Sequence, residues 1–337
     1  MKIITIEDIQ KIIKETGLKL FMERLVDYLT EDFSNWENFH KSPRHATHYD
    51  SGVIELMPTA DDRYYAYKYV NGHPNNPAKN KSTVMATGQL SDTNTGEPLL
   101  YSEMTLATAL RTAATSAFAA KYMLKTGAKT MAIIGTGGQA EFQALAFHFI
   151  NGIENIRYYD IDPAVMEKFA RNLSSFDLNL IPCDSVDSVV DGADCITTVT
   201  AAKKKQVILN VGHIAPGMMI NAVGGDCPGK TELDPAILDS CKVVVEYIPQ
   251  SIIEGEIQNR DESIVYAELW ELVQNRKLGR HDDDEINLFD SVGFAVEDYS
   301  ILRLLYDLAN ELGIGQEMRI IPELSDPKDI FCNFLTP

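Results

Sequence analysis

The sequence predicts an α/β protein with a doubly wound parallel sheet and a second, smaller α+β domain. From Met131 onward, short apolar runs alternate with helical patterns, which is typical of βαβ units and a parallel sheet. Residues 52–102 instead hold several strand-like runs in succession, which indicates a separate unit with its own sheet. At 337 residues the chain is long enough for roughly two domains.

Before Met131 we expect two helices, a group of strands and a third helix. In residues 5–32, apolar side chains such as Ile9 and Ile12 recur at helical spacing. The run Val53–Met57 is apolar on both faces, so we expect it to be buried on both. Further strands are predicted at Tyr65–Val70, Thr83–Leu90 and Pro98–Ser102, and a helix of small residues at 104–124.

The rest of the chain alternates between strands and helices. Helices are predicted at Ala140–Ile150 and at about Phe294–Leu312, and a return of the second helix to the N-terminal domain would make that domain discontinuous. Strands are predicted at Met131–Ile134, Ile156–Tyr159, Cys195–Val199, Met219–Val223, Val243–Glu246 and Ile286–Phe289.

Composition limits the classes of partner. A net charge of −19 disfavours nucleic acids and anionic membranes. The chain has no run of about 18 uncharged apolar residues, so no membrane span is expected. Its five cysteines show no close pairing pattern and residues 1–14 do not resemble a signal peptide, which together predict reduced thiols and a cytoplasmic location.

A glycine-rich turn follows the predicted strand that ends at Ile134. Gly135, Gly137 and Ala140 fit the G-x-G-x-x-G/A pattern of Rossmann-like domains, in which backbone N–H groups of the turn and the next helix hold a pyrophosphate. Asp160 ends the next strand 25 residues later (160 − 135), where a carboxylate accepts ribose hydroxyls and repels a 2′-phosphate. The turn therefore predicts NAD rather than NADP. A glycine-rich helix entry without a ligand is the alternative.

Four charged side chains predict a site for a zwitterion. Arg111 is the one charged residue within the small-residue segment Met104–Ala120, and a buried guanidinium needs an anion. Lys68 and Glu55 lie on apolar faces of predicted strands. Together with Arg44, the basic groups suit a carboxylate and Glu55 suits an ammonium group. Salt bridges within the chain, or exposure to solvent, are the alternatives.

Asp226 follows Gly224 and Gly225 at the carboxyl end of a predicted strand, where ligands bind in open α/β sheets. We expect partial burial to raise its pKa toward a value useful for acid/base chemistry. A turn aspartate that caps the loop is the alternative. No metal site is expected, because His45 and His48 lie three residues apart without a cluster of carboxylates or thiols.

These motifs resemble the ornithine cyclodeaminase/mu-crystallin family over nearly the whole chain. The run from Gly224 to Leu233 is more specific to the cyclodeaminase branch than the nucleotide turn is. The resemblance rests on Gly52–Pro58, Tyr67–Pro74, Ala109–Thr115, Asn221–Leu233, Glu254–Gln258 and Asp290–Phe294.

The resemblance implies a role for each matching residue. Asp226 matches the catalytic acid/base, and Glu55 matches a contact to the substrate amino groups. Residues implied in substrate binding are Arg44, Lys68 and Arg111 at the carboxylate and Val292 in the pocket wall. Residues expected at the cofactor are Thr83, Gly135, Gly137, Gly138, Gln139, Asp160, Gly224, Gly225, Lys230 and Ser291.

The family further implies a homodimer that converts L-ornithine to L-proline and ammonia by internal hydride transfer to and from NAD. We expect a discontinuous substrate-binding and dimerisation domain (1–115 plus about 313–337) and an NAD-binding domain (116–312). Three alternatives stay open: lysine cyclodeamination, a net redox reaction as in ketimine reductases and amino-acid dehydrogenases, and a non-catalytic crystallin-like binding role. Lysine has one methylene group more than ornithine, and pocket contacts discriminate against one additional methylene by only ~1–3 kcal/mol.

Overall fold

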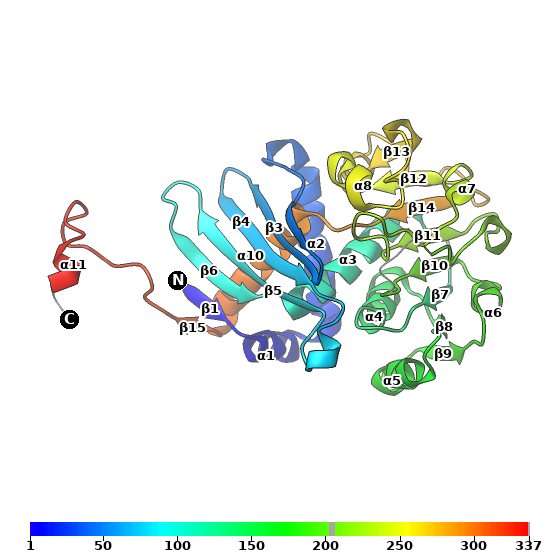
Figure 1. Cartoon of the computed structure of the whole chain (residues 1–337), viewed down its shortest axis with the longest axis horizontal. Coiled ribbons are helices and arrows are strands. Elements are labelled where there is room, and N and C mark those ends of the chain that lie inside the picture. The colour runs from blue at the N-terminus through cyan, green and yellow to red at the C-terminus, as the bar shows by residue number, and fades with distance from the viewer. Residues whose placement is uncertain (202–205, 336–337) are drawn as a thin grey trace.

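The computed structural model describes residues 1–201 and 206–335 and contains two sheets (Figure 1). One sheet has seven strands and the other has eight. Helix α3 (Thr105–Met123) lies between them and packs on helices and strands of both parts. The described residues include no helix that is both long and apolar enough to cross a membrane.

The seven-stranded sheet carries helices on one of its faces. Its order is β15 (Gln316–Glu317), β1 (Lys2–Ile4), β6 (Pro98–Glu103), β5 (Val84–Asp92), β4 (Tyr64–Gly72), β3 (Gly52–Ala60) and β2 (His45–Tyr49). Only the β1–β6 pairing is parallel. The helices of this part are α1 (Ile6–Thr16), α2 (Leu18–Ser34), α3 and α10 (Ala295–Leu312), and the short 3₁₀ turns are Trp36–Asn38 and Pro77–Lys79.

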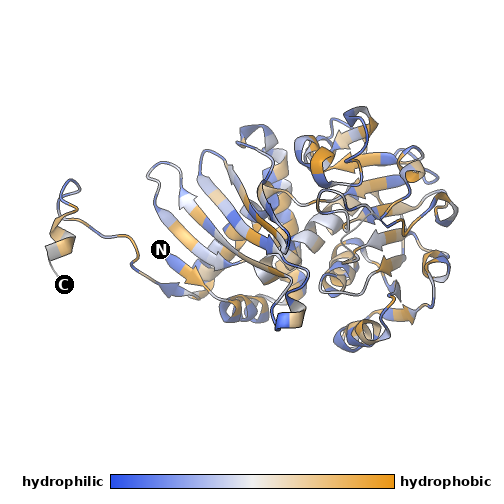
Figure 2. Ribbon diagram, viewed as in Figure 1, coloured by the Kyte–Doolittle hydropathy of each residue, from blue (hydrophilic) through white to orange (hydrophobic). Residues whose placement is uncertain are grey.

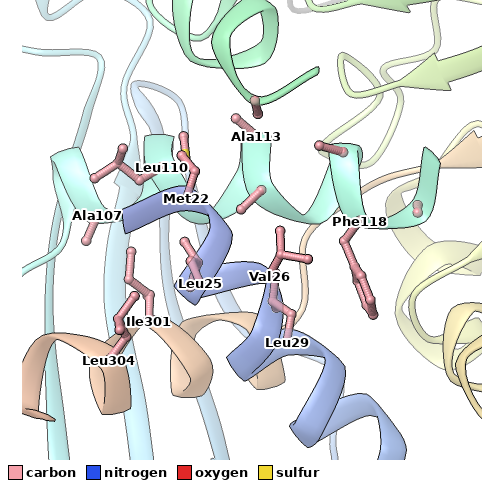
Figure 3. Close-up of a cluster of buried hydrophobic side chains, with 14 of the residues drawn as sticks. Met22, Leu25, Val26, Leu29, Ala107, Leu110, Ala113, Phe118, Ile301 and Leu304 are labelled. Carbon is pink, nitrogen blue, oxygen red and sulfur yellow. The ribbon is translucent and has the colours of Figure 1, made fainter. Parts of the chain in front are cut away.

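The core of this part lies where α2, α3 and α10 meet (Figure 3). Met22 of α2 lies beside Leu110 of α3, and Leu25 of α2 lies nearer to Ile301 of α10. The many alanines of α3 let the neighbouring helices approach closely, which explains why a helix of modest amphipathicity is almost wholly buried.

The opposite face of the seven-stranded sheet is uncovered. Leu56, Tyr65, Tyr69 and Met85 are all about two-fifths exposed there. The prediction that Val53–Met57 is buried on both faces is therefore wrong, because Leu56 lies on the uncovered face while Glu55 and Met57 face the helices.

The eight-stranded sheet is wholly parallel and doubly wound, as predicted. Its order is β13 (Val265–Glu268), β12 (Lys242–Val245), β14 (Asn287–Asp290), β11 (Met219–Ala222), β10 (Cys195–Thr198), β7 (Thr130–Ile134), β8 (Asn155–Tyr159) and β9 (Asn179–Pro182). Its helices are α4 (Ala140–Asn151), α5 (Pro163–Leu173), α6 (Val186–Val190), α7 (Pro235–Leu238), α8 (Ile248–Glu254) and α9 (Leu269–Val273), with 3₁₀ turns at Val211–His213 and Glu262–Ile264.

The strand order reverses between β7 and β10, since β8 and β9 continue on one side and β11 on the other. Ligands bind at the carboxyl ends of strands at such a reversal. The central strands β10, β11 and β14 are buried along their whole length, and each combines apolar residues with one or two buried polar ones (Figure 2).

The domain bounds drawn from the sequence stay a prediction, but they assign α10 to the NAD-binding part. In the structure α10 packs on strands β3 and β4 of the seven-stranded sheet and on helix α2. Beyond Gly313 the chain pairs β15 with β1 and then runs away from the body to α11 (Cys332–Leu335) (Figure 1).

Candidate active site

The glycine turn after β7 has a conformation that only glycine adopts readily. Gly135 has φ +97°, and a Cβ there would lie 2.8 Å from the carbonyl oxygen of Val199. Its N–H donates to the carbonyl of Tyr159 at 2.9 Å. The first glycine of the pattern is thus required by backbone geometry at the carboxyl ends of the neighbouring strands β7, β8 and β10.

The N-terminus of α4 is open to a ligand. Gly137 and Gly138 have no heavy atom within 4 Å of the position a Cβ would take. Gln139 occupies the N-cap position but makes no side-chain capping bond, and its buried Oε1 has no partner among the described residues. Uncapped N–H groups at a helix start suit a pyrophosphate, so these residues fit a dinucleotide.

Asp160 is fixed at the end of β8. Its Oδ2 accepts the N–H of Thr136 at 2.7 Å, and its Oδ1 accepts the N–H of Asp162 at 3.0 Å. The carboxylate therefore lies beside the glycine turn, as expected for a ribose ligand of a dinucleotide.

The other residues expected at the cofactor lie in different places. Thr83 precedes β5, and its carbonyl accepts the N–H of His73 at 2.8 Å. Ser291 follows β14 and donates its hydroxyl to buried Glu246 at 2.7 Å. Lys230 donates to the carbonyl of Thr200 at 2.9 Å. Gly224 and Gly225 pack against the carboxylates of Glu232 and Glu256.

Lys68 and Arg111 converge on one carboxylate. Asp298 Oδ1 accepts from Lys68 Nζ at 2.8 Å and from Arg111 Nε at 3.0 Å, and all three residues are buried. Arg111 Nη1 also donates to Glu297 at 2.7 Å. Because these contacts use one of three donors on Lys68 and two of five on Arg111, both retain N–H groups for a further anion.

Burial sets the ionisation of this cluster. It lowers the pKa of Lys68 to about 8, with neighbouring Arg111 as the next cause. It raises the pKa of Glu297 to about 8, although Arg111 opposes the shift. Gly293 packs directly on Arg111, since a Cβ at this position would lie 2.6 Å from Nη1.

Arg44 joins the two parts of the molecule. Its Nη2 donates to the carbonyls of Val292 and Gly293 at 2.7 and 2.8 Å. Its Nη1 contacts Glu55 at 3.3 Å, and its Nε forms an ion pair with Glu254 at 3.1 Å without hydrogen-bond alignment. The structure thus brings together Arg44, Glu55, Lys68, Arg111 and Val292.

Asp226 lies at the edge of this cluster. Its carboxylate is 59% exposed and pairs with Lys230 Nζ at 3.2 Å, so the expected partial burial is not found. It is near enough to Arg44 and Glu254 to contribute to raising the pKa of both groups. An exposed carboxylate beside a buried cluster is placed to exchange protons with a ligand.

Sequence reasoning missed the buried acids of the site. Asp298, Glu297, Glu246 and Glu254 are each at most 2% exposed. The one local signal was the Glu297–Asp298 pair within an apolar helical pattern, where an unpaired charge is costly.

Comparison with known proteins places the chain in a family. A sequence model of the ornithine cyclodeaminase/mu-crystallin family matches residues 7–313. An ornithine cyclodeaminase of Brucella melitensis is 48% identical over 328 residues, covering 97% of this chain and 91% of that protein. An ornithine cyclodeaminase of Agrobacterium fabrum is also 48% identical and covers 97% and 93%.

Solved structures show the same architecture. A lysine cyclodeaminase structure, described as showing recognition of L-lysine, L-ornithine and L-2,4-diaminobutyric acid, has a TM-score of 0.92 at 28% identity and covers 98% of both chains. An archaeal alanine dehydrogenase dimer with bound NAD has a TM-score of 0.87 at 28% identity and covers 95% of this chain and 99% of that chain. The chain belongs to the ornithine cyclodeaminase/mu-crystallin family.

Proposed function

We propose that the protein is an NAD-dependent ornithine cyclodeaminase, which converts L-ornithine to L-proline and ammonia. The observation that carries the proposal is the cluster in which buried Lys68 and Arg111 retain donors for a carboxylate while Asp226 lies exposed at its edge. The 48% identity to ornithine cyclodeaminases over 97% of the chain supports the same reaction.

The turn from Gly135 to Gln139 and Asp160 would hold NAD, with the pyrophosphate at the start of α4 and a ribose at Asp160. Bound NAD supplies a reversible hydride acceptor. Thr83 and Ser291 are proposed as further contacts because they match cofactor contacts in the family. Gly224, Gly225 and Lys230 are proposed because they lie in the glycine-rich turn after β11.

Lys68 and Arg111 would bind and orient the substrate carboxylate. Arg44 would assist through its Nη1, which donates to Glu55 and to no backbone carbonyl. Glu55 would take an ammonium group of the substrate, and Val292 would line the pocket. Orientation matters because ring closure is intramolecular, and a fixed geometry lowers its barrier.

Asp226 would move the proton. As a base it would take a proton from the attacking side-chain amine, and as an acid it would return one to the leaving ammonia. Lys230 Nζ, 3.2 Å away, would hold the Asp226 side chain in place.

We also propose a homodimer that covers the exposed face of the seven-stranded sheet. Leu56, Tyr65, Tyr69 and Met85 make this face apolar, and contiguous exposed apolar surface marks protein interfaces. The C-terminal segment also exposes Ile320, Ile321, Ile330, Phe331 and Phe334. Sedimentation of the Tyr69→Glu variant tests whether this face is buried in the dimer, with Leu278→Glu as a control at an exposed leucine of the other part. The odd number of cysteines, without a close pairing pattern, supports a cytoplasmic location.

The test is to follow proline, ammonia and NADH absorbance with L-ornithine and substoichiometric NAD⁺. Many turnovers per NAD⁺ with flat absorbance would support the proposal. Turnover of L-lysine in preference to L-ornithine would make the protein a lysine cyclodeaminase. Stoichiometric NADH formation would make it a dehydrogenase, and ligand binding without turnover would leave a binding protein.

A further inference from the structure

The segment Glu254–Gln258 begins at the last residue of α8 and has no part in the chemistry proposed above. It lies between the turn Gly224–Lys230, which carries Asp226, and the Arg44 side chain of the other sheet. Three of its side chains, at alternate positions, reach three different partners.

Glu256 holds the chain directly after the Asp226 turn. Its two carboxylate oxygens accept the backbone N–H groups of Glu232 at 2.8 Å and Leu233 at 3.1 Å. Glu256 is itself held by the end of β14, because its own N–H donates to the Asp290 carboxylate at 2.9 Å. Both carboxylates are buried, so no solvent competes for these bonds.

Three glycines make room for three buried carboxylates. A Cβ on Gly225 would lie 2.7 Å from Glu256 Oε1, and a Cβ on Gly224 or Gly255 would overlap the carboxylate of Glu232 or Asp290. Gly224 and Gly225 therefore have a structural reason to be glycine that is separate from any contact with the cofactor. The backbone that leads into Asp226 rests directly on these acids.

Gln258 holds the far end of the turn. Its Oε1 accepts the N–H of Gly229 at 2.6 Å, and its Nε2 donates to the carbonyl of Lys230 at 2.8 Å. The same amide donates to the carbonyl of Gly255 at 2.9 Å, so one side chain ties the turn to the segment.

Glu254 connects the segment to Arg44, one of the basic side chains proposed to bind the substrate. Its carboxylate pairs with Arg44 Nε at 3.1 Å, and Gln250 of the same helix accepts the backbone N–H of Arg44 at 2.8 Å. A shift of the segment would therefore move Arg44 and the Asp226 turn together.

We infer that Glu254–Gln258 is a positioning segment that sets the location of Asp226 relative to Arg44, with Glu256 and Gln258 as positioning residues. The inference rests on the proposed role of Asp226 as the acid/base. It gives a role to residues 254–258, which are not proposed to contact the cofactor or to supply a reacting group.

The test uses Gln258→Leu, at a half-buried position, and Glu256→Gln. We expect kcat for L-ornithine to fall about 10- to 100-fold with the Kd for NAD unchanged, because a displacement of about 1 Å costs roughly that much. In an Asp226→Asn background, Gln258→Leu should cause no further loss. Losses that multiply in the double variant would overturn the inference.

Hydrogen exchange gives a readout that does not depend on turnover. The amides of Gly229 and Leu233 should exchange faster in the Gln258→Leu and Glu256→Gln variants, respectively, than in the wild type. Asp194→Asn is a matched control. Asp194 also accepts two backbone N–H groups, those of Lys129 and Thr130, but it lies at the amino-terminal ends of the strands, away from the Asp226 turn. Unchanged exchange at both amides would refute the positioning segment even if the protein proved not to be a cyclodeaminase. Altered exchange without ornithine turnover would refute only the proposed function.

Discussion

The ionisation of Lys68 predicts how substrate capture depends on pH. Burial lowers the pKa of Lys68 to about 8, so the side chain loses its charge within the range where enzymes are assayed. If charged Lys68 binds the substrate carboxylate, kcat/KM must fall as the pH rises through this value, because kcat/KM reports the free enzyme. Changing Asp298, the acid that opposes the shift, must then move the alkaline limb.

The size of the effect follows from the titration. With a pKa of about 8, Lys68 is roughly 90% charged at about pH 7 and roughly 10% charged at about pH 9. We therefore expect kcat/KM to fall about tenfold between these values. Asp298→Asn removes the carboxylate 2.8 Å from Nζ and should move the limb to lower pH. Lys68→Arg keeps a charge throughout and should move the limb to higher pH.

The assay is initial-rate proline formation at limiting L-ornithine between pH 6 and 10, with saturating NAD⁺. Ionisation of the substrate amines contributes equally to all three enzymes, so only the difference between variants reports Lys68. An alkaline limb at the same pH in the wild type and both variants would refute the reasoning. A lower absolute activity of the Lys68→Arg variant would not refute it, because only the pH at which the alkaline limb falls is compared.

Three further predictions follow from the structure. Gly225→Ala should lower the free energy of unfolding by about 1–3 kcal/mol, because its Cβ meets Glu256 at 2.7 Å; an unchanged melting temperature would contradict this. Asp160→Ala should narrow the preference for NAD over NADP, as measured by the ratio of the two Kd values, and an unaltered ratio would separate Asp160 from the ribose. Burial raises the pKa of Glu256 from 4.5 to about 7, so the unfolded chain ionises first and the free energy of unfolding should fall by roughly 2 kcal/mol between about pH 5 and pH 7.5. Glu256→Gln should flatten this slope in chemical denaturation, and a slope equal to the wild type would count against the assignment.

Local sequence was sufficient for most of the nucleotide-binding part. Strands β7 and β12 are nearly continuous apolar runs because both faces of the parallel sheet are buried there, and this pattern is visible without a structure. Gly135 was predictable for a similar reason, since the turn after β7 needs a positive φ. The doubly wound sheet and the site for NAD follow from these short-range features.

Long-range packing decided the rest. Leu56 lies in an apolar run yet is exposed, because no helix covers that face of the sheet. β1 and β15 were missed, since strands of three and two residues carry too little pattern to recognise. α10 packs on the first sheet although it follows the last central strand of the second.

The sequence by itself determined the two-domain α/β architecture, the cofactor turn and the set of charged residues from which the site is built. Only the tertiary structure decided which charges meet. Asp298 lies 230 residues from Lys68 and 187 from Arg111, and Glu256 lies 24 from the backbone of Glu232. Such pairs are formed by the crossing of distant elements, and their energy comes from shared burial, which no local pattern of residue types records.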